Sequence, residues 1–293
     1  MVLSDTIKQK HHSSPMTLEE IQRRYAEGET DFRDLNLQNA SLVGLELKKV
    51  DLRGTNFRGA TLIGANLSDS NLREADLTGA NLTEANLYRT NLIESNLTDS
   101  HCFQANFADS SLRASDLSRA NFTEANLNYT ILSDTIINKT NFSQAKLLEA
   151  TLTRVKLVDS DFHQAFLEGA NFTGATLINV NFVEANLSKS LFNNSKALGA
   201  SFQRADLSKA RINKADMSAA DFSEANLREA NLAWTTLWEA NFYRAKLYRA
   251  KLCWANMSKA NLVEAVLLDA DMTQANLTGA DLTMAIMSKP VYE

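Results

Sequence analysis

One neighbouring pair, His101 and Cys102, has the residue types that could support catalysis. A cysteine within reach of a histidine can act as a nucleophile activated by a base. Adjacent residues of an extended segment point to opposite sides, so Cys102 and His101 are expected to face away from each other. His163 has no such neighbour. We therefore predict no catalytic residue and a chain that is not an enzyme.

Metal binding has little support in the sequence. His11 and His12 are adjacent and could ligate a metal, but they lie in a leader that we expect to be disordered, and a structural site needs about four ligands. We predict no metal and no cofactor.

Charged residues recur at a spacing of twenty with alternating sign. If residues twenty apart are neighbours, opposite charges meet, and each exposed pair contributes about 0–1 kcal/mol. We interpret these series as structural. They are Glu184, Arg204, Glu224, Arg244 and Glu264; Lys49, Asp69, Arg89 and Asp109; and Lys209, Glu229, Arg249, Asp269 and Lys289.

Two groups of apolar and aromatic residues are predicted to be exposed and to bind a partner, because such patches often mark interfaces and Trp, Tyr and Arg dominate binding hot spots. An alternative is that they only stiffen the molecule. The first group is Val158, Ile178, Leu198 and Trp238, interrupted by Ser218. The second is Trp234, Tyr243, Arg244, Lys246, Tyr248, Arg249, Lys251 and Trp254, in which the two Trp residues at 234 and 254 should be neighbours.

These residues are positioned by a repeat of five. The stretch from Asp221 to Leu232 repeats a phrase of small residue, Asn or Asp, Leu or Phe, and two polar residues. Large apolar centres recur at every fifth position from Phe32 to Met287 with no change of phase. Period five fits neither a helix nor a regular strand. Each phrase instead suits one side of a polygon with the centre and the small residue inside.

Four such sides make a lap of twenty residues, which predicts an all-β quadrilateral coil with about thirteen laps. Phenylalanines at seven successive centres twenty apart should then stack along one inner wall. They are Phe122, Phe142, Phe162, Phe182, Phe202, Phe222 and Phe242.

The pattern closely resembles the pentapeptide-repeat family, whose phrase is Ala-Asp/Asn-Leu-X-X. Near-consensus copies are Ala65-Asn66-Leu67, Ala75-Asp76-Leu77 and Ala80-Asn81-Leu82-Thr83-Glu84, and the resemblance covers about residues 30 to 290. It implies a right-handed quadrilateral parallel β-helix. Some members regulate cell differentiation in cyanobacteria, and others mimic DNA and bind gyrase.

The domain organisation expected from the sequence is a disordered leader over 1–16, a capping helix over 17–28 and the β-helix over 29–290. Thr17 and Glu20 have the residue types and the spacing of a capping box, and Gly28 is suited to end the helix. One lap has Ala197 at a centre followed by Leu198, which either bulges inward or stays outside. The far end is expected to be covered by a tail that includes Val291 and Tyr292, giving a monomer, or by an end-to-end homodimer.

Composition and net charge argue against several classes of protein. Net charge is −5, whereas nonspecific nucleic-acid binders are usually basic, so we do not expect this function. No apolar run is long enough for a membrane span and no signal-peptide core is present, which predicts a cytoplasmic protein without a membrane partner. Cys102 and Cys253 should be free thiols.

Our hypothesis is a scaffold or regulator that binds an unknown protein through one flat face near Trp234, Trp238 and Trp254. A DNA mimic that inhibits an enzyme such as gyrase is a weaker alternative, because only Glu74, Glu94 and Asp134 approach a like-charged column. A carbohydrate-binding β-helix is another alternative. It lacks groove-forming insertions.

Overall fold

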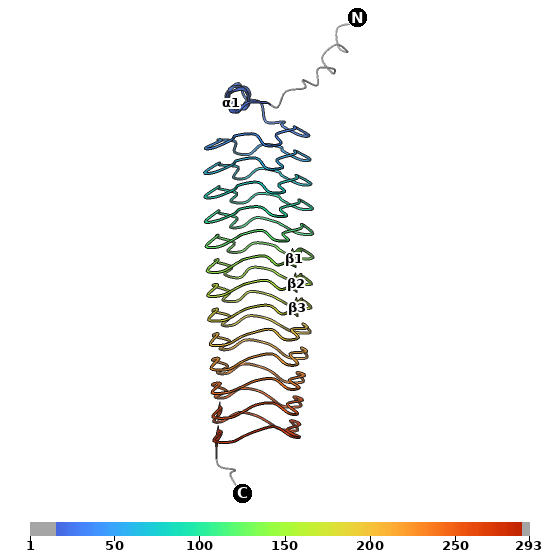
Figure 1. The fold of residues 1–293 in the computed structure, drawn as a ribbon, viewed down its shortest axis with the longest axis vertical. Helices are drawn as coiled ribbons and strands as arrows, with labels where there is room; N and C mark the ends of the chain where they lie inside the picture. Colours follow the sequence, from blue (N-terminus) through green and yellow to red (C-terminus); the bar gives the residue numbers. More distant parts are fainter. Residues whose placement is uncertain (1–15, 289–293) are drawn as a thin grey trace, which may run out of the picture.

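The protein forms one straight rod. The structure is a computed structural model, and it describes residues 16–288. Helix α1 (Leu18–Ala26) lies at one end, and the rest of the described chain winds in stacked laps toward the other end (Figure 1).

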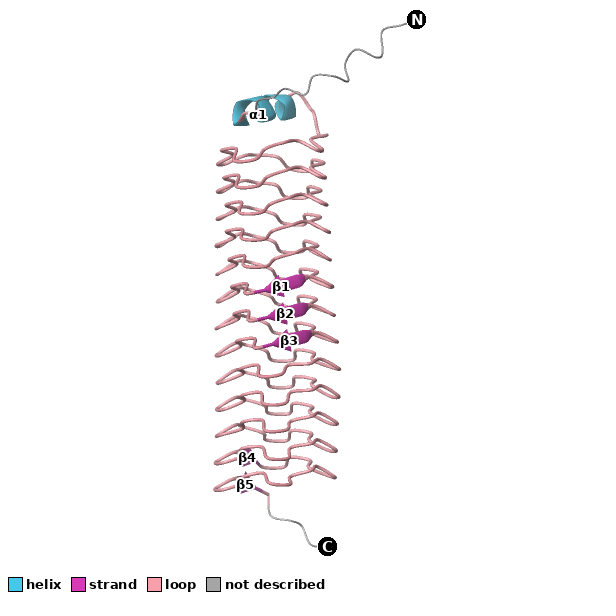
Figure 2. Cartoon of the chain, turned by 45° about the vertical axis from the view of Figure 1, so that its right-hand side comes forward, coloured by secondary structure: helices cyan, strands magenta, loops and turns pink. Residues whose placement is uncertain are grey.

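Successive laps are joined by parallel β-bridges between residues twenty apart, from Asp31 with Asp51 to Asn261 with Asp281. This register confirms the predicted lap of twenty. Longer pairing produces five short strands: β1 (Ile136–Asn138), β2 (Lys156–Val158) and β3 (Thr176–Ile178) form one sheet, and β4 (Val266–Leu267) and β5 (Ile286–Met287) form another. Figure 2 shows β1 to β3 stacked on one side of the rod.

The Asn or Asp of each phrase shapes the turn that follows it. Its side-chain oxygen accepts the backbone N–H two residues later, as Asp221 does from Ser223 at 2.9 Å. Asn side chains also donate to the Asn one lap earlier, as Asn106 does to Asn86 at 3.1 Å. The second residue of the turn has a left-handed backbone, with φ of 62° at Trp234. Short polar side chains suit this geometry because they can bond to their own turn.

The interior is filled by the predicted centres, which are buried from Phe32 to Leu267. The seven phenylalanines from Phe122 to Phe242 stack with neighbouring ring centroids 4.7 to 5.2 Å apart, which confirms their predicted column. At the weak lap, Ala197 is fully buried and Leu198 is 53% exposed. The lap therefore keeps its phase, and Leu198 stays outside.

Helix α1 lies against the first lap. Ile21 is buried in the core, and Leu18 and Tyr25 pack against the same core. The Thr17 hydroxyl accepts the Glu20 N–H at 3.3 Å, which confirms half of the capping box. The other half is wrong, because the Glu20 carboxylate accepts hydrogen bonds from the Arg23 guanidinium instead.

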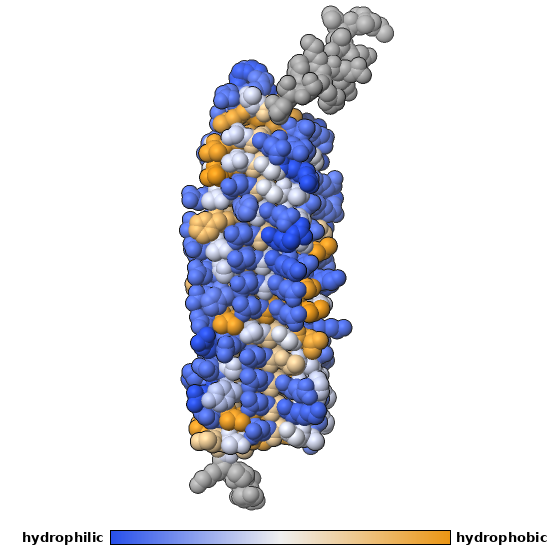
Figure 3. All heavy atoms as spheres, in the orientation of Figure 1, coloured by the Kyte–Doolittle hydropathy of each residue, from blue (hydrophilic) through white to orange (hydrophobic). Residues whose placement is uncertain are grey.

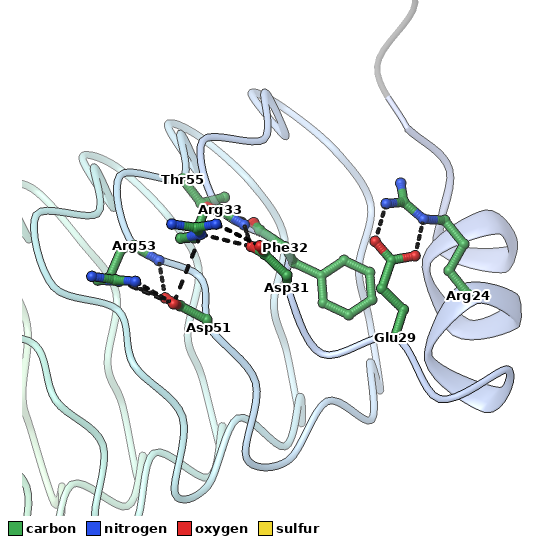
Figure 4. Close-up of polar contacts among 8 residues, drawn as sticks. All are labelled: Arg24, Glu29, Asp31, Phe32, Arg33, Asp51, Arg53 and Thr55. Carbon is green, nitrogen blue, oxygen red and sulfur yellow. Dashed lines mark hydrogen bonds and ion pairs between the residues drawn. The ribbon is translucent and has the colours of Figure 1, made fainter. Parts of the chain in front are cut away.

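The chain leaving α1 is held by the ion pair of Arg24 with Glu29, and the Arg24 guanidinium lies 5.5 Å from the centre of the Phe32 ring (Figure 4). Below it, the Thr55 hydroxyl donates to the Phe32 carbonyl at 3.0 Å, and Arg33 pairs with Asp31 at 2.6 Å. A cation, an aromatic ring and a buried hydroxyl therefore fix the first lap to the helix on one side and to the second lap on the other.

The far end differs. Leu277 and Leu282 are half-buried, and Met287 is exposed. Val291 and Tyr292 lie outside the described residues, so the tail cap and the end-to-end dimer stay predictions.

Candidate protein-interaction surface

The coil has four sides, which we number in chain order. Side 1 contains Phe32, side 2 Leu37, side 3 Leu42 and side 4 Leu47, each with the residues that follow at intervals of twenty. Corner 1 is the turn after side 1, and corners 2 to 4 follow in the same way. A residue's corner is thus fixed by its position within a lap of twenty.

Ten of the twelve predicted contact residues are spread over all four corners and not over one flat face, and the other two, Lys246 and Lys251, lie on sides 4 and 1. Tyr243 and Arg244 form corner 3, on the far side of the rod from corner 1. The prediction of a single face is wrong for these two, because residues five apart along the chain lie on successive corners. Corner 1 has Trp234 and Trp254; corner 2 has Val158, Ile178, Leu198 and Trp238; corner 3 has Tyr243 and Arg244; corner 4 has Tyr248 and Arg249.

Corner 1 carries a tryptophan stack. The rings of Trp234 and Trp254 are 4.9 Å apart and almost parallel, at 4°, as their spacing predicts. They are 55% and 51% exposed. Both have left-handed backbone angles, 62° and 61°, so the turn projects two large side chains outward at the cost of some strain. Two stacked and half-exposed indoles are an apolar surface that nothing else in the described chain covers.

Corner 2 carries a row of apolar side chains. Val158 pairs in register with Ile178, and Leu198 follows in the next lap. Ser218 is largely buried and breaks the row before Trp238, whose ring has the Lys259 ammonium 5.4 Å from its centre. Figure 3 shows hydrophobic side chains in such a row along one edge of the rod. Side 2 is therefore bounded by apolar side chains at both of its corners.

The two tyrosines interact with arginines instead. The Arg244 guanidinium lies 4.9 Å from the Tyr243 ring centre. Tyr248 has two such neighbours, Arg249 at 4.8 Å and Arg228 at 5.3 Å. Cation–π contacts at exposed sites contribute about 0.5–1 kcal/mol, so these pairs also stiffen the corners.

The alternating charges form ion pairs between laps, as predicted for several members of each series. Glu184 pairs with Arg204 at 3.1 Å, and Arg244 with Glu264 at 2.7 Å. Three more predicted pairs are longer: Asp69 with Arg89, Lys209 with Glu229 and Arg249 with Asp269 lie 3.5 to 3.9 Å apart. The prediction is wrong for five further pairs, which do not come within 4.0 Å: Lys49–Asp69, Arg89–Asp109, Arg204–Glu224, Glu224–Arg244 and Glu229–Arg249. Lys289 lies outside the described residues.

The acidic column that would support a DNA mimic is neutralised. Glu74 and Glu94 both contact the Arg73 guanidinium, at 3.0 and 2.6 Å. Asp134 forms a bidentate pair with Arg154, which lowers the pKa of the carboxyl. These carboxylates therefore do not present a continuous negative face.

Cys102 is not placed for nucleophilic chemistry. It is fully buried, and burial raises the pKa of its thiol to about 12, partly offset by the Ser100 hydroxyl 3.4 Å away. His101 is exposed on the outside of the same lap. Both cysteines are free. The thiol lacks the depressed pKa and the access that reactive cysteines share.

Sequence reasoning missed a groove along corner 3 and side 4. It has a volume of about 740 Å³ and is lined by long polar side chains with the Phe166 ring, which is 53% exposed, beside Lys146. The available signal was Phe166 itself, an apolar residue at a position usually taken by Asn or Asp. The lining includes Gln104, Glu124, Gln144, Gln164 and Glu184, which form hydrogen bonds from lap to lap.

The groove does not have the carboxylate geometry of a glycoside hydrolase. Glu124 and Glu184 are three laps apart, about 14 Å at the usual strand spacing, whereas paired catalytic carboxylates lie about 5 to 10 Å apart. Gln144 and Gln164 occupy the positions between them.

Neither a metal centre nor a membrane span is found among residues 16–288. No group of three or more His, Cys, Asp or Glu side chains gathers there in a way that would hold a metal ion. Helix α1 is the one helix of that range, and it is too short and too polar to cross a bilayer. His11 and His12 lie outside the described residues.

Comparison with known proteins identifies the repeat. The family model described as pentapeptide repeats matches residues 30–69, 60–99, 100–138, 135–174, 225–262 and 254–289. A related model, the pentapeptide repeat region, matches residues 165–242. Among curated proteins, no match is found.

Solved structures that resemble the chain include pentapeptide-repeat and quinolone-resistance proteins, and also two alginate-modifying epimerases at 8% and 10% identity. HetL, involved in heterocyst differentiation regulation in the cyanobacterium Nostoc, is 26% identical over 93% of this chain and 97% of its own, with a TM-score of 0.22. QnrB1, a plasmid-mediated fluoroquinolone resistance protein, is 18% identical over 59% of this chain and 94% of its own, with a TM-score of 0.38. AT2G44920 from the Arabidopsis thaliana thylakoid lumen is 32% identical over 34% of this chain and 66% of its own, with a TM-score of 0.20.

Because the TM-scores are low, the solved structures do not decide the assignment. It rests on the two family models, which together cover most of the rod. The fold that this family implies is a right-handed β-helix, as expected from the resemblance. The chain belongs to the pentapeptide-repeat family.

Proposed function

We propose that this protein is a non-enzymatic scaffold or regulator that binds a protein partner, and that the contact centres on corner 1 and the sides next to it. The observation that carries the proposal is the exposed stack of Trp234 on Trp254. A cytoplasmic location is part of the same proposal.

The surface chemistry supports binding over simple stiffening. Trp residues supply large contact areas with little loss of side-chain entropy and are enriched at hot spots. Stacking inside the rod already joins successive laps through the buried phenylalanines. An exposed stack adds little to that cohesion but leaves apolar surface in water, which a partner would cover.

The test is affinity capture from extracts of the native cell with the full-length chain as bait. The double variant Trp234→Ala with Trp254→Ala is expected to lose at least one partner that the unmodified chain retains. Tyr129→Ala is a matched control, because Tyr129 is also an exposed aromatic residue with a left-handed backbone, but it lies on corner 4. Retention of every partner by the tryptophan variant, or equal losses in the tyrosine variant, would overturn the proposal.

A further inference from the structure

Over three laps, the charge around side 1 is opposite in sign to that of the whole chain. Residues 208–214, 228–234 and 248–254, which form corner 4, side 1 and corner 1 in three successive laps, contain six basic side chains and one acidic side chain, Glu229. The chain as a whole has a net charge of −5. The basic surface consists of Lys209, Arg211, Lys214, Arg228, Arg249 and Lys251.

Most of the basic surface has no acidic partner. Lys209 and Arg249 make long ion pairs, with Glu229 at 3.9 Å and Asp269 at 3.8 Å. The remaining four basic side chains are exposed, and none comes within 4.0 Å of a carboxylate oxygen of residues 16–288, although Lys251 is in register with Asp271 of the next lap. Elsewhere the laps usually place opposite charges together, as in the bidentate pair of Arg119 with Asp99. The basic surface therefore departs from the pattern of the rod.

Aromatic residues frame the basic surface on both sides. Corner 1 has the stack of Trp234 and Trp254, and Lys214 precedes Trp234 by one lap on the same corner. Corner 4 has Tyr248 with Arg249 and Arg228 against its ring. In register across side 1, Arg211 pairs with Asn231 and Asn231 with Lys251. Cations and aromatic rings thus share one continuous area.

The geometry favours an acidic polypeptide over a nucleic acid. A single-stranded nucleic acid gains affinity when bases stack on open aromatic faces. Here each indole covers one face of the other, and two guanidinium groups lie against Tyr248. Both indoles are half-exposed, and each has an N–H donor. N–H donors and free cations suit carboxylates, and the apolar surface of the indoles suits aliphatic side chains.

We infer that side 1 between residues 208 and 254 is the docking surface for an acidic, partly apolar segment of the protein partner. This inference rests on the proposed function and adds the chemistry of the partner. Charge complementarity carries it: a basic and aromatic strip about three laps long on a chain that is otherwise acidic. Complementary charge also raises the rate of association and lowers affinity for wrong partners.

The test measures binding of fluorescent peptides to the full-length chain. One peptide alternates Glu with Leu, a second has Gln in place of each Glu, and a third has Lys. A single-stranded oligonucleotide of thymidine is the nucleic-acid probe. We expect the Glu peptide to bind at least tenfold tighter than the Gln and Lys peptides. Its affinity should fall as ionic strength rises beyond about 0.15 M, where the Debye length is about 8 Å.

Charge reversal locates the site. Arg211→Glu with Lys251→Glu should weaken binding of the Glu peptide at least tenfold. The control, Lys49→Glu with Lys146→Glu, makes the same change of charge at exposed lysines of corner 4 and side 4 that lie three or more laps from residue 208, and it should leave affinity within about twofold. Equal binding of the Glu and Gln peptides, equal losses in the two variants, or tighter binding of the oligonucleotide would each overturn the inference.

The two proposals fail separately. If a captured partner is lost with the tryptophan variant but retained by Arg211→Glu with Lys251→Glu, the scaffold function stands and the acidic partner is wrong. If no partner depends on the tryptophans, the proposed function falls first.

Discussion

The two ends of the rod use the same five-residue phrase with different outcomes. At the first end, Phe32 and Leu37 are fully buried beneath α1. At the far end, Leu277 is half-buried on the same side as Leu37, and the centre Met287 is 51% exposed. The phrase sets which way a side chain points at both ends. Burial, however, comes from the next layer, which α1 supplies at one end and which no residue up to 288 supplies at the other.

The comparison indicates that a centre is fully buried, and so contributes its full share of stability, only when it has neighbours on both sides along the axis. In repeat proteins stability is approximately a sum of terms between nearest neighbours, so terminal units are the weakest unless something covers them. We therefore expect the two ends to differ in local stability, and the following changes should remove or reveal that difference.

The largest effect is expected from Ile21→Asp. Losing the buried side chain alone is worth about 2 kcal/mol, and an unpaired carboxylate in the core adds a larger penalty. Helix α1 should detach, and amide hydrogen exchange of residues 31–47 should rise to the level of residues 272–287. The exposed control Glu19→Asp should change neither end. Unchanged protection of the first lap would mean that α1 does not stabilise it.

A matched pair of substitutions compares the ends directly. Leu37→Ala should lower the free energy of unfolding by about 3 kcal/mol, because it leaves a cavity between two layers. Leu277→Ala removes the same group from the same side and should cost about 1 kcal/mol, since the site is half-buried. Urea denaturation followed by circular dichroism measures both. Equal losses would contradict the difference between the two ends and would mean that the far end is covered, either by residues beyond 288 or by a second copy of the chain.

The N-cap of α1 tests a smaller contribution. Thr17→Ala removes the hydroxyl that accepts the Glu20 N–H and should cost about 1 kcal/mol. Thr17→Ser keeps the acceptor and should be close to neutral. Exchange of the amide hydrogens in residues 18–26 reports the difference. Identical exchange in the two variants would contradict a capping role.

The smallest effect concerns pH at the first lap. The hydrogen bonds from Arg33 lower the pKa of Asp31 to about 2. Because the folded pKa lies below the ordinary value of 3.8, this contact stabilises the fold above about pH 4 and is lost as the pH falls toward 2. Carbon-13 NMR titration should place Asp31 near 2 and return it toward 3.8 in Arg33→Ala. At the far end, Asp281, whose pKa is lowered chiefly by Thr283, should not respond to that change.

Much of this structure was predictable because spacing determines it. Period five places Leu37 and Leu277 on one inner wall and makes Trp234 and Trp254 neighbours, and both are observed. The same arithmetic places Tyr243 and Arg244 on corner 3, half a lap after Trp234. Residues of one lap therefore need not share a face of the rod. The sequence does not decide whether Leu198 bulges inward, because the answer depends on the hydrogen bonds between laps. In the structure the Ala197 N–H donates to the Asp216 carbonyl at 2.7 Å, and a bulge would break that bond.

Other features depend on which of several competing contacts is the stronger, and the sequence alone does not show this. Glu20 could reach the backbone or Arg23, and the charged hydrogen bonds of the guanidinium are the stronger choice. The groove beside Phe166 arises from the lengths and rotamers of the surrounding Gln and Glu side chains. Spacing fixes which corner a residue occupies, but not how far its side chain extends from that corner.

The lap of twenty residues has a consequence for how such a gene can be lengthened by internal duplication. Duplicating twenty residues would lengthen the molecule and leave every column of the surface intact. Duplicating a single phrase of five would keep the interior equally well filled, yet everything downstream would rotate by a quarter turn. If the new phrase lay between Lys214 and Trp234, the two tryptophans would stay together on one corner, but both would move to a different corner from Lys214. Selection for folding alone would accept both events, whereas selection for a recognised surface would accept only the first.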